Sequence, residues 1–255
     1  ENAAGIALSL VKPGQKVGYQ FKTFNKGSDY TGLMNIVNTR VSVRKFNLAF
    51  DGSYLYSKGP LINTGFLRST TDLSRPIGIF ILGGRYEQER NKIQDAFSDS
   101  LKLNSFSYDA GKIYVTSSDT SKIRFRIDFS RRFDYAVKSN DFRKTAEADE
   151  ASGKVEFLGN PKSRLTLSSS YRNLVIVDTV LSAQLPEESI LNRAEYSATI
   201  LKGFITSMTF YEAGTGQELK REYAFLEVAP GTGVYTYAGD YNGNGVKDID
   251  EFEIA

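Results

Sequence analysis

The sequence predicts an all-β protein, built as a long antiparallel meander of hairpins. Two observations lead to this prediction. Apolar and polar residues alternate with a period of two along several stretches, and turn-forming residues interrupt those stretches at short intervals. Helical spacing is hard to find, and residues 141 to 150, which have the most helix-compatible composition, lack an apolar stripe.

The clearest alternation lies between residues 122 and 130. Successive side chains of a strand point to opposite faces, so this stretch has one apolar and one charged face. The apolar face carries Ile123, Phe125, Ile127 and Phe129, and the charged face carries Lys122, Arg124, Arg126 and Asp128. Residues 43 to 56 and 164 to 171 alternate in the same way. Several of the runs exceed the usual strand length of about five or six residues.

Short clusters of Gly, Pro, Asn, Asp and Ser separate the predicted strands. Such clusters favour tight turns, and strands joined by tight turns pair as antiparallel neighbours. The candidate turns are Asp109-Ala110-Gly111, Ser117-Ser118-Asp119, Gly159-Asn160-Pro161, Lys202-Gly203, Gly214-Thr215-Gly216 and Pro230-Gly231.

Two architectures fit these strands. An outer-membrane-type β-barrel turns its apolar face to lipid and its charged face to a wet lumen, where Arg124, Arg126 and Asp128 would lie. A soluble β-sandwich or barrel turns the apolar face to a second layer of protein and the charged face to solvent. The 15 Tyr and 17 Phe suit the aromatic girdles of a membrane barrel, whereas the absence of Trp is less typical of one. The period of the pattern fits both architectures.

The composition excludes several classes of function. The chain has 255 residues, 40% of them hydrophobic, which is enough for one large all-β domain or two smaller ones. Lys and Arg number 32 against 30 Asp and Glu, with the two signs mixed along the chain, so nucleic acid is not an expected partner. His and Cys are absent, which removes Ser-His and Cys-His nucleophiles, thiolate metal sites and disulfides.

Paired carboxylates are the remaining catalytic candidates. Glu87 and Glu89 share one face of a predicted strand, but carboxylates at this spacing are more often solvated side chains than an acid/base pair. We therefore expect a protein that is not an enzyme and has no catalytic residues. The chain opens at Glu1 without a basic or apolar leader, so we expect any signal peptide to have been removed or to lie upstream.

Residues 240 to 251 space oxygen ligands as a calcium loop does. Ca²⁺ takes six to eight oxygens, and a twelve-residue loop supplies them from positions one, three, five, seven, nine and twelve. Those positions hold Asp240, Asn242, Asn244, Val246 with its backbone carbonyl, Asp248 and Glu251. Gly245 stands at the sixth position, where the loop must turn sharply. We predict a structural calcium site here, in an extended segment at residues 231–255 that follows a β-rich domain at residues 1–230.

The calcium loop differs from a helix-flanked EF-hand in two ways. Its eighth position is Lys247 instead of an aliphatic residue, and the segment before it looks extended, so we expect a loop without paired helices. The alternative is a plain turn, rich in Asn, Gly and Asp, whose side chains cap their own backbone.

The C-terminal third resembles a known group of proteins. Residues 196 to 223, then Val228-Ala229-Pro230-Gly231-Thr232-Gly233-Val234-Tyr235, then residues 240 to 255 are similar to a stretch of large Bacteroidota outer-membrane or cell-surface proteins. Gly84-Arg85-Tyr86-Glu87-Gln88-Glu89-Arg90-Asn91 is similar to the same group through less specific motifs. The resemblance implies an envelope-located, β-rich segment of a longer polypeptide.

Two functions remain open from the sequence. The first is an outer-membrane β-barrel segment that acts in transport, secretion or surface scaffolding and carries a structural calcium loop. The second is a soluble all-β cell-surface module that binds a partner or a glycan. Both place the protein at the bacterial outer membrane or cell surface, with the lipid bilayer or other envelope proteins as its partners.

Overall fold

The computed structural model describes residues 2–182, 184–215, 228, 233–241, 243, 245 and 247–254. The chain divides into two units, Glu1–Gln217 and Glu218–Ala255, and each is described by itself. The predicted domain boundary, between residues 230 and 231, lies outside the described residues.

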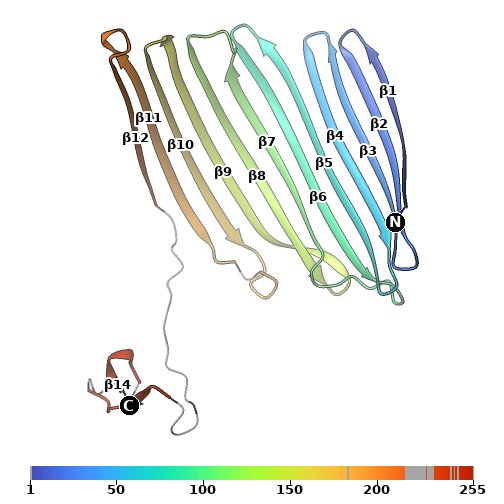
Figure 1. The fold of residues 1–255 in the computed structure, drawn as a ribbon, viewed down its shortest axis with the longest axis vertical. Coiled ribbons are helices and arrows are strands. Elements are labelled where there is room, and N and C mark those ends of the chain that lie inside the picture. Colours follow the sequence, from blue (N-terminus) through green and yellow to red (C-terminus); the bar gives the residue numbers. More distant parts are fainter. Residues whose placement is uncertain are drawn as a thin grey trace. The chain divides into compact units, whose positions relative to one another are not determined.

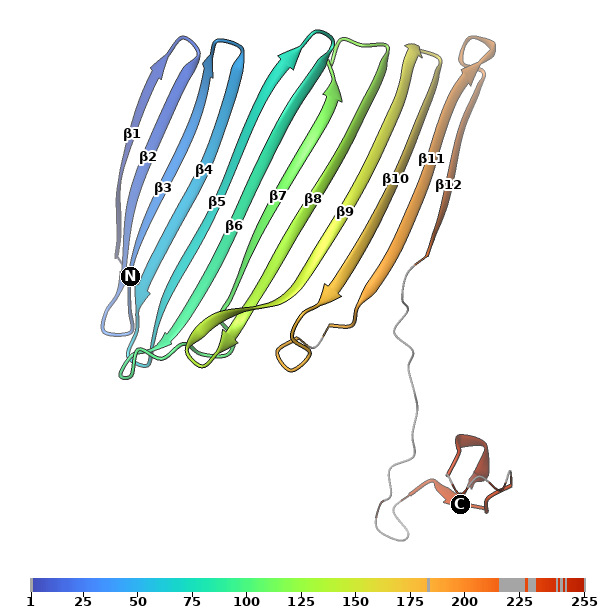
Figure 2. The ribbon, with the colours of Figure 1, turned by 180° about the vertical axis from the view of Figure 1, so that it is seen from behind.

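The first unit contains a twelve-stranded antiparallel sheet whose strands follow one another in chain order (Figure 1), which confirms the predicted all-β meander. Figure 2 shows the same order from behind, with β1 and β12 at the two edges. The strands are β1 (Asn2–Lys12), β2 (Gln15–Lys26), β3 (Tyr30–Val43), β4 (Phe46–Lys58), β5 (Ile62–Ile77), β6 (Phe80–Asp95), β7 (Phe106–Ser117), β8 (Ile123–Lys138), β9 (Asp141–Asn160), β10 (Ser163–Ile176), β11 (Glu187–Ile200) and β12 (Ile205–Thr215).

One predicted turn is wrong. Asp109, Ala110 and Gly111 lie inside strand β7, although their residue types favour a turn. The carboxylate of Asp109 accepts hydrogen bonds from the Tyr86 hydroxyl at 2.7 Å and from the Gln88 amide at 3.0 Å, both on the neighbouring strand β6. These cross-strand bonds hold the segment extended. Gly214 and Thr215 end strand β12, and the predicted turn at Pro230-Gly231 lies outside the described residues.

The two ends of the sheet differ in their connections. At one end, named here the short-turn end, two residues join β1 to β2, β3 to β4, β5 to β6 and β9 to β10. Several residues there have the positive φ that tight hairpins require, among them Gly14 at 71° and Gly78 at 61°. At the opposite, long-loop end, ten residues join β6 to β7 and another ten join β10 to β11.

The hairpins are staggered by a constant step. A row of directly paired residues starts at Gln15, beside the β1–β2 turn, and crosses the sheet to Ile190. The distance of this row from the short-turn end grows along the sheet. Counted from the short-turn end of each strand, the row lies two residues away on β4, four on β5, six on β8, eight on β10 and ten on β11. The short turns are thus displaced by two residues along the strand direction for every two strands. A displacement of this size inclines the strands by roughly 35° from the perpendicular to the line through the short turns, as in β-barrels.

The register assigns every residue of the sheet to one of two faces, because directly paired residues point to the same side. The face of Ile127 and Phe129 is named the apolar face, and that of Asp128 the polar face. The small core lies on the polar face and consists of Ala146, Ala148 and Leu174, with Ile176 packed against it. Asp128 is only 7% exposed, whereas the neighbouring Ile127 is 61% exposed. At this position the sheet therefore shields a carboxylate and exposes an apolar side chain.

The second unit contains a small two-stranded antiparallel sheet. Strand β13 (Tyr235–Tyr237) pairs with β14 (Phe252–Ile254), and a short 3-10 helix, η2 (Ile249–Glu251), precedes β14. The Tyr237 and Phe252 rings pack with their centroids 5.4 Å apart. In the part of the chain that the structure describes, no helix is long and apolar enough to cross a membrane.

Candidate membrane-facing surface and candidate calcium loop

A continuous apolar surface covers the apolar face of the sheet. Each of the twelve strands contributes at least one large hydrophobic side chain that is exposed there, and together these residues are named the apolar belt. The belt includes Leu8, Val17, Val43, Leu48, Leu73, Leu82, Ile113, Ile127, Phe129, Phe157, Leu167, Ile190 and Ile205. Exposed apolar patches of more than a few hundred Å² are rare on soluble monomers and mark interaction surfaces.

A line of tyrosines follows the border of the belt nearer the long-loop end. Tyr54 on β4, Tyr86 on β6, Tyr171 on β10 and Tyr211 on β12 are exposed on this face and lie six to eight residues from the short-turn end of their strands. Followed across the paired rows, Tyr54 is level with residue 135 of β8 and Tyr211 is level with residue 125, ten residues away along that strand. A displacement of ten residues over eight strand spacings inclines the tyrosine line by roughly 40° from the perpendicular to the strands. This is close to the slope of the short turns, so the belt keeps a nearly constant height above them.

Beyond the tyrosine line, toward the long-loop end, the same face becomes polar. Arg131 and Asp149 form a bidentate ion pair there, with N–O distances of 2.6 and 2.7 Å. Asp109 of β7 lies on the same side of the sheet. On most strands the belt thus lies in the part nearer the short turns, with Leu33 of β3 and Val175 of β10 as exposed apolar side chains beyond it. An apolar band with an aromatic border and a polar continuation is typical of a membrane-facing sheet surface.

The polar face holds a network of charges. Asp128 accepts hydrogen bonds from Arg126 at 3.0 Å and Ser152 at 2.8 Å, and the Lys112 ammonium lies 3.4 Å away. The expected position of Arg126 and Asp128 on one charged face is confirmed by the register. Because each charge that leaves water needs a partner, such pairing allows this face to be partly buried.

Glu87 and Glu89, the carboxylates considered as a catalytic pair, each have an arginine partner on this polar face. Glu89 accepts from Arg68 at 2.7 Å, and Glu87 pairs with Arg85 at 2.5 Å. These ion pairs connect a carboxylate to a side chain of the same or the adjacent strand. They therefore account for both residues as part of the charge network.

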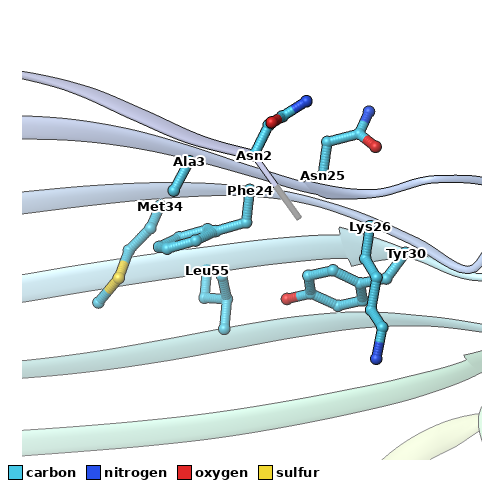
Figure 3. Close-up of a pocket in the computed structure, with 8 residues that line it drawn as sticks. All are labelled: Asn2, Ala3, Phe24, Asn25, Lys26, Tyr30, Met34 and Leu55. Carbon is cyan, nitrogen blue, oxygen red and sulfur yellow. The ribbon is translucent and has the colours of Figure 1, made fainter.

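A hollow of about 590 Å³ lies at the edge of the sheet, over strands β1 to β4 (Figure 3). Phe24, Met34 and Leu55 lie together in it, on the polar face, and Asn2 and Asn25 form its margin. Our sequence reading missed this hollow. The signal was available in β2, where Phe21 and Phe24 lie three residues apart and so break the strict alternation.

The predicted calcium ligands fall into two groups. Asp240, Asp248 and Glu251 are described by the structure, whereas Asn242, Asn244 and Val246 lie outside the described residues. The carboxylate of Asp240 accepts hydrogen bonds from the amides of Gly243 at 2.6 Å and Gly245 at 2.8 Å. Gly245 has a φ of 73°, as the predicted sharp turn requires.

Glu251 is fully buried, with an exposed fraction of 0%. Its two carboxylate oxygens accept hydrogen bonds from the amides of Tyr241 at 2.9 Å and Asp248 at 3.1 Å. The pKa of Tyr237 is raised by desolvation and by the nearby carboxylates of Glu251 and Asp240. Negative charge is thus concentrated beside β13.

The donor set is suitable for a hard cation, because carboxylate oxygens have further lone pairs beyond those used by amides. Within the described residues, however, no group of three or more acidic side chains is arranged to hold a metal ion. The amide bonds to Asp240 and Glu251 are also those of a self-capping turn. The calcium site therefore stays a prediction.

The first unit defines a class of fold: one antiparallel sheet with an exposed apolar face and an ion-paired face. No family model matches the sequence, and no curated protein matches it. A similar solved structure is "OmpT (in-vitro folded), an outer membrane protein of Vibrio cholerae", with 7% identity and a TM-score of 0.41, over 84% of this chain and 85% of that chain. Similarity at this level is not evidence of a shared function. The resemblance to Bacteroidota surface proteins also stays a prediction.

Proposed function

We propose that the first unit forms part of the wall of an outer-membrane β-barrel in the bacterial envelope, with the apolar belt against lipid and the polar face toward an aqueous lumen. The observation that carries this proposal is the reversed exposure of the sheet. Ile113, Ile127 and Leu82 are exposed on one face, while Asp128 and Glu89 are shielded on the other. A soluble protein gains stability from the opposite arrangement.

The height of the belt supports lipid as its covering layer. On β8 the belt runs from Ile123 to Phe129, which is roughly 20 Å at 3.3 Å per residue. The apolar band of outer-membrane barrels is about 25 Å tall. A second protein layer would have no reason to follow a level border of tyrosines, whereas the flat interface of a bilayer would impose one.

We propose a non-enzymatic role for this wall. The charged lumen face would conduct or guide polar solutes, so transport or secretion is the role we propose, with surface scaffolding through the long loops as a further one. The hollow lined by Phe24, Met34 and Leu55 favours a second candidate: a cell-surface module that binds a partner or glycan there. In that case another protein would cover the belt.

Partition between water and lipid tests the proposed function. The purified chain is refolded with and without phospholipid vesicles and then floated on a density gradient. We expect the chain to float with the vesicles, to resist extraction by high salt or carbonate, and to keep a β-type circular dichroism spectrum. A chain that stays monomeric and folded in detergent-free buffer, and remains at the bottom of the gradient, would contradict the membrane role and support the soluble module.

We also propose that calcium clamps residues 240 to 251. A ligand that binds only the folded state stabilises it by about 2.7 kcal/mol when its concentration is a hundred times Kd. Asp240→Ala and Glu251→Ala are expected to abolish calcium binding by the intact chain, measured by calorimetric titration with calcium chloride in detergent. Asp250→Ala is the matched control, because this exposed neighbour is not among the predicted ligands. If the wild-type chain bound no calcium, the calcium site would be rejected and residues 240 to 251 would be interpreted as a self-capping turn.

A further inference from the structure

Two basic side chains lie directly opposite each other on the polar face of the sheet. Arg85 of β6 and Lys112 of β7 are paired in register, so their side chains are neighbours on that face. Like charges in this arrangement destabilise a sheet unless negative charge is close to both. The pair therefore marks a place where a bound anion would be stabilising.

A hollow of about 340 Å³ lies over this pair and extends across strands β6 to β10. Four basic and two acidic residues line it: Arg85, Lys112, Arg132, Arg172, Glu87 and Glu150. Its other lining residues, Ala110, Ser130 and Ala148, have small side chains. The hollow is thus an open space with more positive than negative charge around it.

The carboxylates of the protein use only part of the hydrogen-bonding capacity of the arginines in this hollow. The Nε atom of Arg85 lies 2.5 Å from the Glu87 carboxylate. Arg132 donates to Asp134 from Nε at 3.0 Å and from Nη2 at 2.7 Å, and its guanidinium lies 3.9 Å from the Tyr108 ring centroid. A guanidinium has five N–H donors in a planar fork, so both arginines keep donors for an external ligand.

Arg172 of β10 lies at the other end of the hollow from Arg85 and Lys112. It is exposed and is directly paired with Glu150 of β9 and Ser189 of β11. Among the residues that the structure describes, neither the Arg172 guanidinium nor the Glu150 carboxylate has a hydrogen-bond or ion-pair partner. An arginine whose whole fork is available is suited to bidentate binding of a carboxylate or phosphate group.

We propose that this hollow binds a small solute with two or more anionic groups, of the phosphate or carboxylate type. Arg172 would hold one anionic group, and Arg85 together with Lys112 would hold another. Three strand spacings, roughly 14 Å, separate the backbones of β7 and β10, a span that their long basic side chains reduce to the size of such a solute. In a barrel wall the site faces the lumen, so it assigns anions as the solutes that are guided there; this consequence rests on the proposed function.

Titration of the intact chain with sodium pyrophosphate tests the site, by calorimetry in non-ionic detergent and calcium-free buffer of low salt. Sodium succinate, a dicarboxylate, distinguishes carboxylate from phosphate recognition, and glucose is the uncharged control. Arg172→Gln is the main variant, because it leaves no carboxylate of the fold without its partner. Glu150→Gln removes a negative charge from the hollow. Lys154→Gln is the matched control, since Lys154 lies on the same face of β9, outside the hollow.

We expect the wild-type chain to bind at least one of the two anions and not to bind glucose. Arg172→Gln is expected to weaken binding by about tenfold, the usual effect of losing a charge-assisted hydrogen bond. Lys154→Gln should change Kd by less than about threefold, as for an exposed charge that does not touch the ligand. Glu150→Gln should strengthen binding, because it removes repulsion between the carboxylate and the anion.

Equal losses in Arg172→Gln and Lys154→Gln would overturn the site, because the attraction would then come from the whole face. Weaker binding by Glu150→Gln would overturn it as well. Folded chain that floats with vesicles but binds neither anion rejects the site and leaves the proposed membrane function standing. Chain that binds an anion in the expected order of variants but does not float keeps the site and rejects the membrane function.

Discussion

Ile127→Arg is expected to lower the free energy of unfolding of the membrane-inserted chain by about 2 to 4 kcal/mol. This is the cost of a basic side chain at the midplane on the lipid face of a β-barrel. Ile127 is well suited to the test because it is 61% exposed, so the substitution removes little packing. The measurement is equilibrium unfolding in urea with vesicles present, followed by tyrosine fluorescence or circular dichroism.

Val180→Arg is the matched control for Ile127→Arg. Val180 is also an apolar residue with high exposure, 86%, but it lies in the ten-residue loop after β10, outside the belt. We expect its substitution to change stability by less than about 0.5 kcal/mol, as for ordinary surface positions. If the belt faced water, Ile127→Arg would be equally neutral and would improve solubility, so comparable effects at both sites would contradict lipid contact.

Gly83→Val is expected to destabilise the sheet by about 1 to 3 kcal/mol, the usual cost of forcing a side chain into occupied space. A Cβ atom at Gly83 would overlap the ring of Tyr114 on the next strand. Tyr114 is held in place by a hydrogen bond to Asp72 at 2.9 Å and by the Arg126 guanidinium, 4.4 Å from its ring centroid. Displacing the ring therefore disturbs contacts among four strands, β5 to β8. The loss is measured by urea unfolding in the same vesicles.

Gly111→Val separates overlap from the general effect of replacing glycine in a strand. Gly111 lies in β7, and no atom lies close to where its Cβ would be. Valine favours strands, and this position faces outward within the apolar face, so the substitution should be neutral or stabilising. If Gly83→Val and Gly111→Val lowered the free energy of unfolding equally, overlap with the Tyr114 ring would not be the cause of the loss at Gly83.

The sequence was sufficient to predict the strands but not their environment. The alternation from Lys122 to Ser130 correctly places Ile127 and Asp128 on opposite faces of β8. The period alone leaves open which face is exposed, because a lipid-facing strand and a core-facing strand have the same pattern. The answer comes from packing over many strands, which shields Asp128 and leaves Ile127 exposed.

The wrong turn at residues 109 to 111 and the missed hollow have a similar cause. Local residue preferences favour a turn at Asp109, but its hydrogen bonds to Tyr86 and Gln88 come from residues more than twenty positions away. The hollow combines Phe24, Met34 and Leu55 from three strands. Such contacts depend on register, which no single segment contains. The predicted calcium loop is different, since all its ligands lie within twelve consecutive residues and spacing alone suggests it.

The chain-order pairing of the strands has a consequence for how the protein folds. Every pair in the twelve-stranded sheet joins neighbours in sequence, so each strand can add to the growing edge by closing a loop of only two to ten residues. Loops of this length close at low entropic cost, and structures rich in local contacts fold fast for their size.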